Sequence, residues 1–108
     1  MSQVTLNRVW TATKKILRDI VKLKKAELTS EKVDEYSTDL KELIKILESM
    51  DDRSGKVEMR IALLLDYISL LGFLRDYLND PTAEKAKSLL ARGDTDPTIR
   101  PVIEHFVQ

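Results

Sequence analysis

Apolar residues recur in the first half of the chain with the period of an α-helix. Over residues 3–26 they fall on one arc, and lysine and arginine fall on the opposite arc. Residues 30–50 follow the spacing i, i+3, i+4, i+7. This pattern is typical of helices that bury one face. The predicted core positions are Leu6, Val9, Trp10, Ile16, Leu17, Ile20, Val21 and Leu23 in the first helix, and Val33, Tyr36, Leu40, Leu43, Ile44, Leu47 and Met50 in the second.

A third helix is predicted over residues 56–79, after a turn at 51–55 that contains Gly55. Its apolar residues surround the helix on nearly all sides, so it must be covered by its neighbours or by another subunit. The most apolar run, IALLLDYISLLGFL, has 14 residues and contains Asp66, so it is too short to cross a bilayer.

The tripeptide Asp-Pro-Thr occurs at residues 80–82 and again at 96–98. In the first copy, Asp80 is a favourable N-cap and Pro81 suits the first helical position. A fourth helix is therefore predicted over 81–91, with Gly93 as its stop signal.

The second copy repeats this start signal with Asp96 and Pro97. Pro101 follows within the first turns, so the last helix either kinks there or begins at Pro101. Together the patterns predict an all-α fold: an antiparallel bundle of three long helices plus one or two short C-terminal helices. At 108 residues, the chain is expected to form a single domain over 1–108.

The composition narrows the function classes. There is no cysteine, which excludes disulfides, thiolate metal sites and a cysteine nucleophile. The single histidine excludes a metal site built from several histidines, and no phosphate loop or dinucleotide fingerprint is present, so no metal and no cofactor are expected. The absence of cysteine and of a signal-like apolar run favours a cytoplasmic protein. A charged fraction of one third with few Asn and Gln resembles proteins from hot environments.

Charge is distributed unevenly although the formal net charge is zero. Residues 1–28 carry seven Lys/Arg against two Asp/Glu, and residues 29–54 carry four against eight. The basic stripe of the first helix is open to three interpretations: a solvated face salt-bridged to the second helix, a phosphate-contacting nucleic-acid site, or a membrane-surface helix. The candidate nucleic-acid-binding residues are Lys14, Arg18, Lys22 and Lys25.

The segment RPVIEH places Arg100 five residues before His105. This spacing resembles the Arg-x4-His motif of HEPN-domain ribonucleases, which are small helical proteins that commonly act as dimers. The resemblance implies that Arg100 would steady phosphate charge and that His105 would act as acid or base in RNA cleavage.

The leading functional prediction is a non-enzymatic accessory or adaptor subunit. The surplus apolar surface of the third helix favours a protein partner or a homodimer. The basic first helix would suit a place in a nucleic-acid-processing complex. The alternative is a HEPN-like domain that cleaves or binds RNA with Arg100 and His105.

Overall fold

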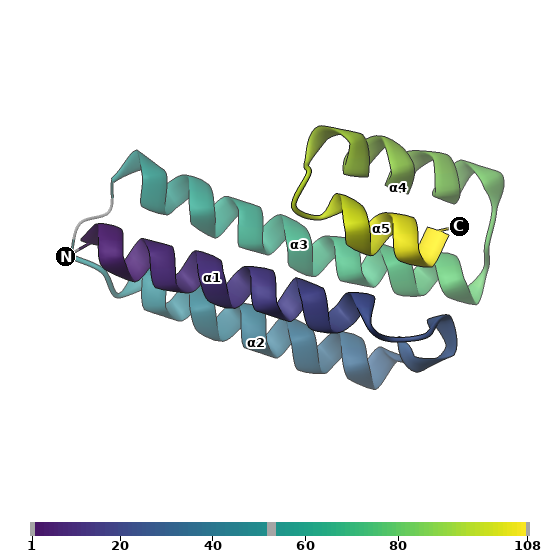
Figure 1. Cartoon of the computed structure of the whole chain (residues 1–108), viewed down its shortest axis with the longest axis horizontal. Coiled ribbons are helices and arrows are strands. Elements are labelled where there is room, and N and C mark those ends of the chain that lie inside the picture. The colour runs from purple at the N-terminus through teal and green to yellow at the C-terminus, as the bar shows by residue number, and fades with distance from the viewer. Residues whose placement is uncertain (1, 52–53, 108) are drawn as a thin grey trace.

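The chain folds into α-helices. The computed structural model describes residues 2–51 and 54–107. Within these two ranges it contains five α-helices, one short 3-10 helix and no strand (Figure 1). The predicted all-α fold is confirmed, and residues 52 and 53 of the predicted turn lie outside the described residues. The helices are α1 (Ser2–Val21), α2 (Ser30–Glu48), α3 (Gly55–Asn79), α4 (Ala83–Thr95) and α5 (Arg100–Val107), with η1 (Lys25–Glu27) between α1 and α2.

The last two helices differ in their position. α5 packs among the other helices with one side exposed, whereas α4 lies at the edge of the bundle. Figure 1 shows α1, α2 and α3 running lengthwise, each reversing the direction of the one before. α2 packs against both α1 and α3. The short α5 contacts both α1 and α3, whereas α4 packs against α5 and α3. In this way α5 fills the space that α1 and α3 leave between them.

Buried apolar side chains from α1, α2, α3, α4 and α5 form the core, and α3 supplies more of them than any other described helix. Leu64, Tyr67 and Leu71 of α3 are completely buried. An isolated helix of eight residues is not stable in water, so α5 depends on its packing. Burying a large apolar side chain contributes about 1.5–3 kcal/mol, and four side chains of α5 are buried. These are Val102, Ile103, Phe106 and Val107.

A polar network fixes the turn between α4 and α5 against α3. The hydroxyl of Tyr67 donates a 2.7 Å hydrogen bond to Asp96 Oδ2, and the Thr98 amide donates a 2.9 Å hydrogen bond to Asp96 Oδ1. Arg92 forms ion pairs with both Asp66 and Asp96. Burial raises the pKa of Tyr67, and the hydrogen bond to Asp96 raises this pKa further. The network satisfies a buried phenol while it links three helices.

The first helix ends earlier than predicted. The prediction extended it to residue 26, but α1 ends at Val21 and η1 follows at Lys25–Glu27. The chain turns away from the helix axis here and brings Leu28 into the core, where it is completely buried. Lys25 therefore does not continue the helical face of α1, which corrects its placement in the basic stripe.

The fourth helix begins later than predicted. Its N-cap is Thr82, whose hydroxyl accepts a 3.2 Å hydrogen bond from the Lys85 amide. Asp80 instead ends α3, where its amide donates to the Asp76 carbonyl. Because Asp80 is still bonded to α3, the next helix can start only after Pro81. The assignment of Asp80 as N-cap was wrong.

Gly93 does not stop α4, as the sequence predicted. It is buried inside the helix, which continues to Thr95. A Cβ atom at this position would lie 3.4 Å from the Ile103 side chain, so the glycine allows α4 and α5 to approach closely. The second Asp-Pro-Thr forms a turn, and α5 begins at Arg100 rather than at Pro97 or Pro101. Both copies of the tripeptide precede a helix, but neither Asp-Pro pair forms its first residues.

In the part of the chain that the structure describes, none of the helices combines the length and the apolar character that a bilayer crossing requires.

Candidate functional site

Lys14 and Arg18, two cations of the predicted basic stripe, have no acidic partner among the described residues. Lys14 and Arg18 are exposed on α1, and neither forms an ion pair with a described acidic side chain. Lys22, directly after α1, lies 3.9 Å from Asp19, at 78% side-chain exposure. The predicted salt bridging of the stripe to the second helix is therefore not formed by Lys14 or Arg18.

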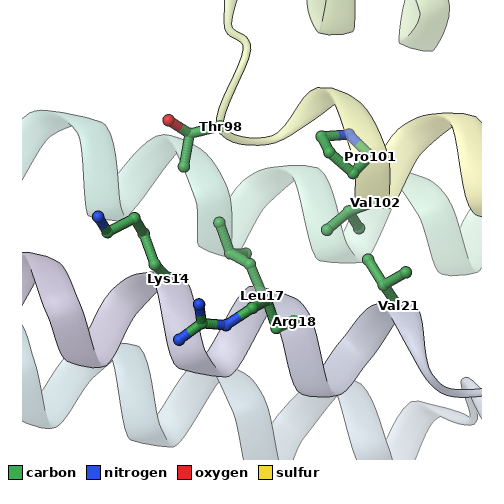
Figure 2. A pocket seen from close by; sticks show the side chains of 7 residues that line it. All are labelled: Lys14, Leu17, Arg18, Val21, Thr98, Pro101 and Val102. Carbon is green, nitrogen blue, oxygen red and sulfur yellow. The ribbon is translucent and has the colours of Figure 1, made fainter.

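A pocket of about 200 Å³ lies where these two cations meet the C-terminal part of the chain (Figure 2). Leu17 and Val102 are buried in its floor, because they also pack α1 against α5. The docking of α5 thus brings residues 77 or more positions apart into one site. The lining residues are Lys14, Leu17, Arg18, Val21, Thr98, Pro101 and Val102.

The two ends of this pocket differ in chemistry. Figure 2 shows the cationic groups of Lys14 and Arg18 and the hydroxyl of Thr98 toward one end. Val21, Pro101 and Val102 lie toward the other end. We call this site the α1–α5 pocket. An anionic group would be attracted to the first end, and an aliphatic group would be sheltered from water at the second.

Arg100 and His105 make separate contacts within the chain. The Arg100 guanidinium donates to the Gly93 carbonyl at 3.1 Å and to the Asp94 carbonyl at 2.9 Å, at the end of α4. The His105 Nε2 donates to the Leu23 carbonyl at 2.6 Å. Residues five apart on a helix project about 140° from each other. The single chain therefore does not bring these two side chains to one site.

The outer side of α3 is apolar and uncovered. Leu65 is 52% exposed and Phe73 is 60% exposed, although both belong to the helix that supplies more of the core than any other described helix. Between and beside them on the same side lie three small exposed residues. We call this set the α3 outer surface: Ala62, Leu65, Ser69, Gly72 and Phe73.

A groove of about 440 Å³ between α3 and α4 borders the α3 outer surface at Phe73. Two of its three carboxylates are paired: Asp66 with Arg92, and Asp76 with Lys85 at 3.2 Å. The hydrogen bond that Arg92 donates to Asp66 raises the pKa of Arg92, and the one that Lys85 donates to Asp76 raises the pKa of Lys85. Charge along the groove is therefore largely neutralised, and its floor is apolar.

Sequence reasoning identified Lys14 and Arg18 but missed their neighbours in the pocket. From the sequence, Thr98 and Pro101 indicated only where the last helix begins. No local signal pairs them with α1, because the contact depends on how α5 docks. Within the described residues, no group of three or more histidine or acidic side chains is arranged to hold a metal ion.

No protein-family model, no curated protein and no solved structure matches the chain.

Proposed function

We propose that this protein is a non-enzymatic accessory or adaptor subunit that binds a helix of a partner protein on the α3 outer surface. The observation that carries the proposal is the exposure of Leu65 and Phe73 on one side of α3. Isolated exposed apolar residues are common, but two large ones along one side of a core helix form a continuous surface. Covering them would remove apolar area from water.

Gly72 supports a close contact with another chain. It lies inside α3, where glycine costs about 1 kcal/mol relative to alanine. A Cβ atom at this position would find open space, so nothing within the chain requires the glycine. The absence of a side chain at Gly72 would allow the backbone of a partner to approach α3 closely.

The neutralised groove beside this surface favours a partner with an apolar contact face. A partner helix lying along α3 would place apolar side chains against Phe73 and into the groove toward α4, as in other helix-in-groove complexes. Its charged residues would meet Asp66 and Asp76, which already have partners.

A second copy of the chain fits less well. The α3 outer surface spans residues 62–73, a strip about 16 Å long and 10 Å wide, which gives roughly 160 Å² per subunit. Stable dimers bury about 800 Å² per partner. A partner helix can contact α3 and the α3–α4 groove together. We therefore propose that the occupant is a helix of a different protein.

The test compares the tagged wild-type chain with Leu65→Gln/Phe73→Gln in affinity purification from the native host. A matched control, Val4→Gln/Ile46→Gln, changes two exposed apolar residues on other helices. We expect one protein to co-purify with wild type and control but not with the α3 variant. The corresponding isolated helix should then bind purified wild-type chain at least tenfold more tightly than the α3 variant.

Gly72→Leu gives a second, steric test. The open space around Gly72 means that the variant should fold with at least wild-type stability, yet it should block the partner. Partner retention by Gly72→Leu and by the α3 variant would contradict the proposal. A concentration-dependent dimer in sedimentation that the α3 variant dissociates would replace the partner helix with a second copy.

A further inference from the structure

The α1–α5 pocket has the two features of a site for a mixed ligand. Its cationic end carries Lys14 and Arg18, and its apolar end is formed by Val21, Pro101 and Val102. A ligand that satisfies both must carry a negative group next to an aliphatic one. An inorganic anion would leave the apolar end empty.

The cations are free to meet such a ligand. Neither Lys14 nor Arg18 has an acidic partner among the described residues, in contrast to Arg92 and Lys85, which each contact two carboxylates. An incoming carboxylate would therefore not have to displace an existing ion pair. Arg18 can also bind a carboxylate through two hydrogen bonds.

The size of the pocket limits the ligand. Small-molecule sites are usually about 300–1,000 Å³, and this pocket is about 200 Å³. It suits one anchoring side chain of a larger molecule rather than a complete cofactor or nucleotide. Its rim is open to the surface, so the rest of the partner can continue across α1.

Nucleic acid fits the pocket less well than a peptide. Single-stranded nucleic acid binds by stacking bases on aromatic rings, and the lining contains no aromatic residue. A phosphate would contact Lys14 and Arg18, but a phosphodiester carries no aliphatic group for the other end.

We propose that the α1–α5 pocket binds an acidic segment of a protein partner, in which an aliphatic side chain fills the apolar end and an adjacent carboxylate pairs with Lys14 and Arg18. This site is separate from the α3 outer surface, and neither proposal depends on the other. A single partner could use both surfaces, or two partners could bind together.

The probe is a displayed library of randomised 12-residue peptides, selected separately against three folded proteins. These are the wild type, Lys14→Glu/Arg18→Glu, and the control Lys15→Glu/Lys22→Glu. Both variants change the net charge by the same amount and alter exposed residues in α1 or directly after it, but only the first changes the pocket. Circular dichroism melting verifies that all three are folded.

We expect wild type and control to enrich peptides in which Leu, Ile, Val or Met adjoins Asp or Glu. The pocket variant should lose this enrichment, and the best synthetic peptide should bind it at least tenfold more weakly. In NMR spectra of wild type, that peptide should shift the methyl signals of Leu17, Val21 and Val102. Enrichment without acidic residues, or enrichment that survives reversal of Lys14 and Arg18, would overturn the proposal.

A nucleic-acid arm uses a fluorescein-labelled 12-nucleotide single strand at about 50 mM salt, where electrostatic binding is strong. We expect any binding to fall equally in the pocket variant and the control, because both remove the same charge. Oligonucleotide binding lost only in the pocket variant, with no acidic peptide selected, would assign the cations to phosphate instead.

Discussion

The cations on α1 and those at the junction of α3, α4 and α5 have opposite surroundings. Arg92 pairs with Asp66 and Asp96, and Arg100 donates to two carbonyls at the end of α4. Lys14 and Arg18 have no acidic partner among the described residues. Both regions carry positive side chains, but only Arg92 and Arg100 are bonded within the fold.

This difference shows why a formal net charge of zero says little about function. The charges balance over the whole chain, yet the paired cations hold α4 and α5 in place while the unpaired ones face solvent. Exposed ion pairs contribute little, whereas charges that bond to half-buried groups contribute more. Substitutions in the two regions should therefore have very different effects on stability.

The largest effect is expected at the centre of the paired region. Asp96→Ala removes the acceptor of the buried Tyr67 hydroxyl and the acceptor of the Thr98 amide. The loss should be about 2–4 kcal/mol, since an unpaired buried donor costs about 1–3 kcal/mol and the lost hydrogen bond of the Thr98 amide about 1 kcal/mol. Urea denaturation measures it. The control Asp94→Ala, at an exposed position, should stay within about 0.5 kcal/mol of wild type. Equal losses in the two variants would contradict the role of the network.

Arg100→Ala should destabilise the chain by about 1–3 kcal/mol, because two carbonyls at the end of α4 lose a charged donor.

The same variant separates the two functional hypotheses. The adaptor proposal expects no RNA cleavage by purified wild type. The HEPN-like alternative expects cleavage that Arg100→Ala and His105→Ala each abolish, and an RNA cleavage assay with both variants decides between them.

Tyr67→Phe should cost about 0.5–1.5 kcal/mol near neutral pH, where it removes one hydrogen bond. It should also change the response to alkali. The folded state raises the pKa of Tyr67, so it favours the neutral phenol. That contribution is present below the ordinary pKa of about 10 and is lost as the pH rises toward the higher folded value. Unfolding free energy measured above about pH 10 should therefore fall more steeply in wild type than in Tyr67→Phe. Parallel curves would show that the phenol is not linked to folding.

The smallest effect on stability is expected on α1. Lys14→Gln/Arg18→Gln should change the free energy of unfolding by no more than about 0.5 kcal/mol, because neither side chain has an acidic partner to lose. Thermal melting in low and high salt provides the measurement. A loss above about 1 kcal/mol would mean that these cations support the fold after all.

Periodicity predicted α1, α2 and α3 because their apolar positions repeat over many turns. The ends of helices depend on weaker and more local competition. Asp80 and Thr82 are both good caps, and the choice fell to Thr82 because Asp80 is still bonded to α3. Gly93 looked like a stop signal, but its neighbour is Ile103 of another helix, which the sequence near it does not reveal.

The candidate surfaces were predictable only in part. The excess of apolar residues on the third helix was evident, but which of them would be exposed depended on where α4 and α5 pack. Leu65 and Phe73 look no different in sequence from the buried Leu64 and Leu71. Likewise, Lys14 and Arg18 were visible as part of a stripe, while the apolar end of their pocket also requires the distant residues Pro101 and Val102.

The position of α5 between α1 and α3 has a consequence for the order of folding. Most contacts in helical proteins are local, which makes their folding fast. Here the hydrogen bond between His105 and Leu23 joins residues 82 positions apart, so docking α5 closes a loop that contains most of the chain. The apolar sides of α1 and α3 cannot be fully buried from water until that loop is closed. We expect the amides of α1 and α5 to become protected from hydrogen exchange in the same kinetic step, and later than those of the α2–α3 hairpin.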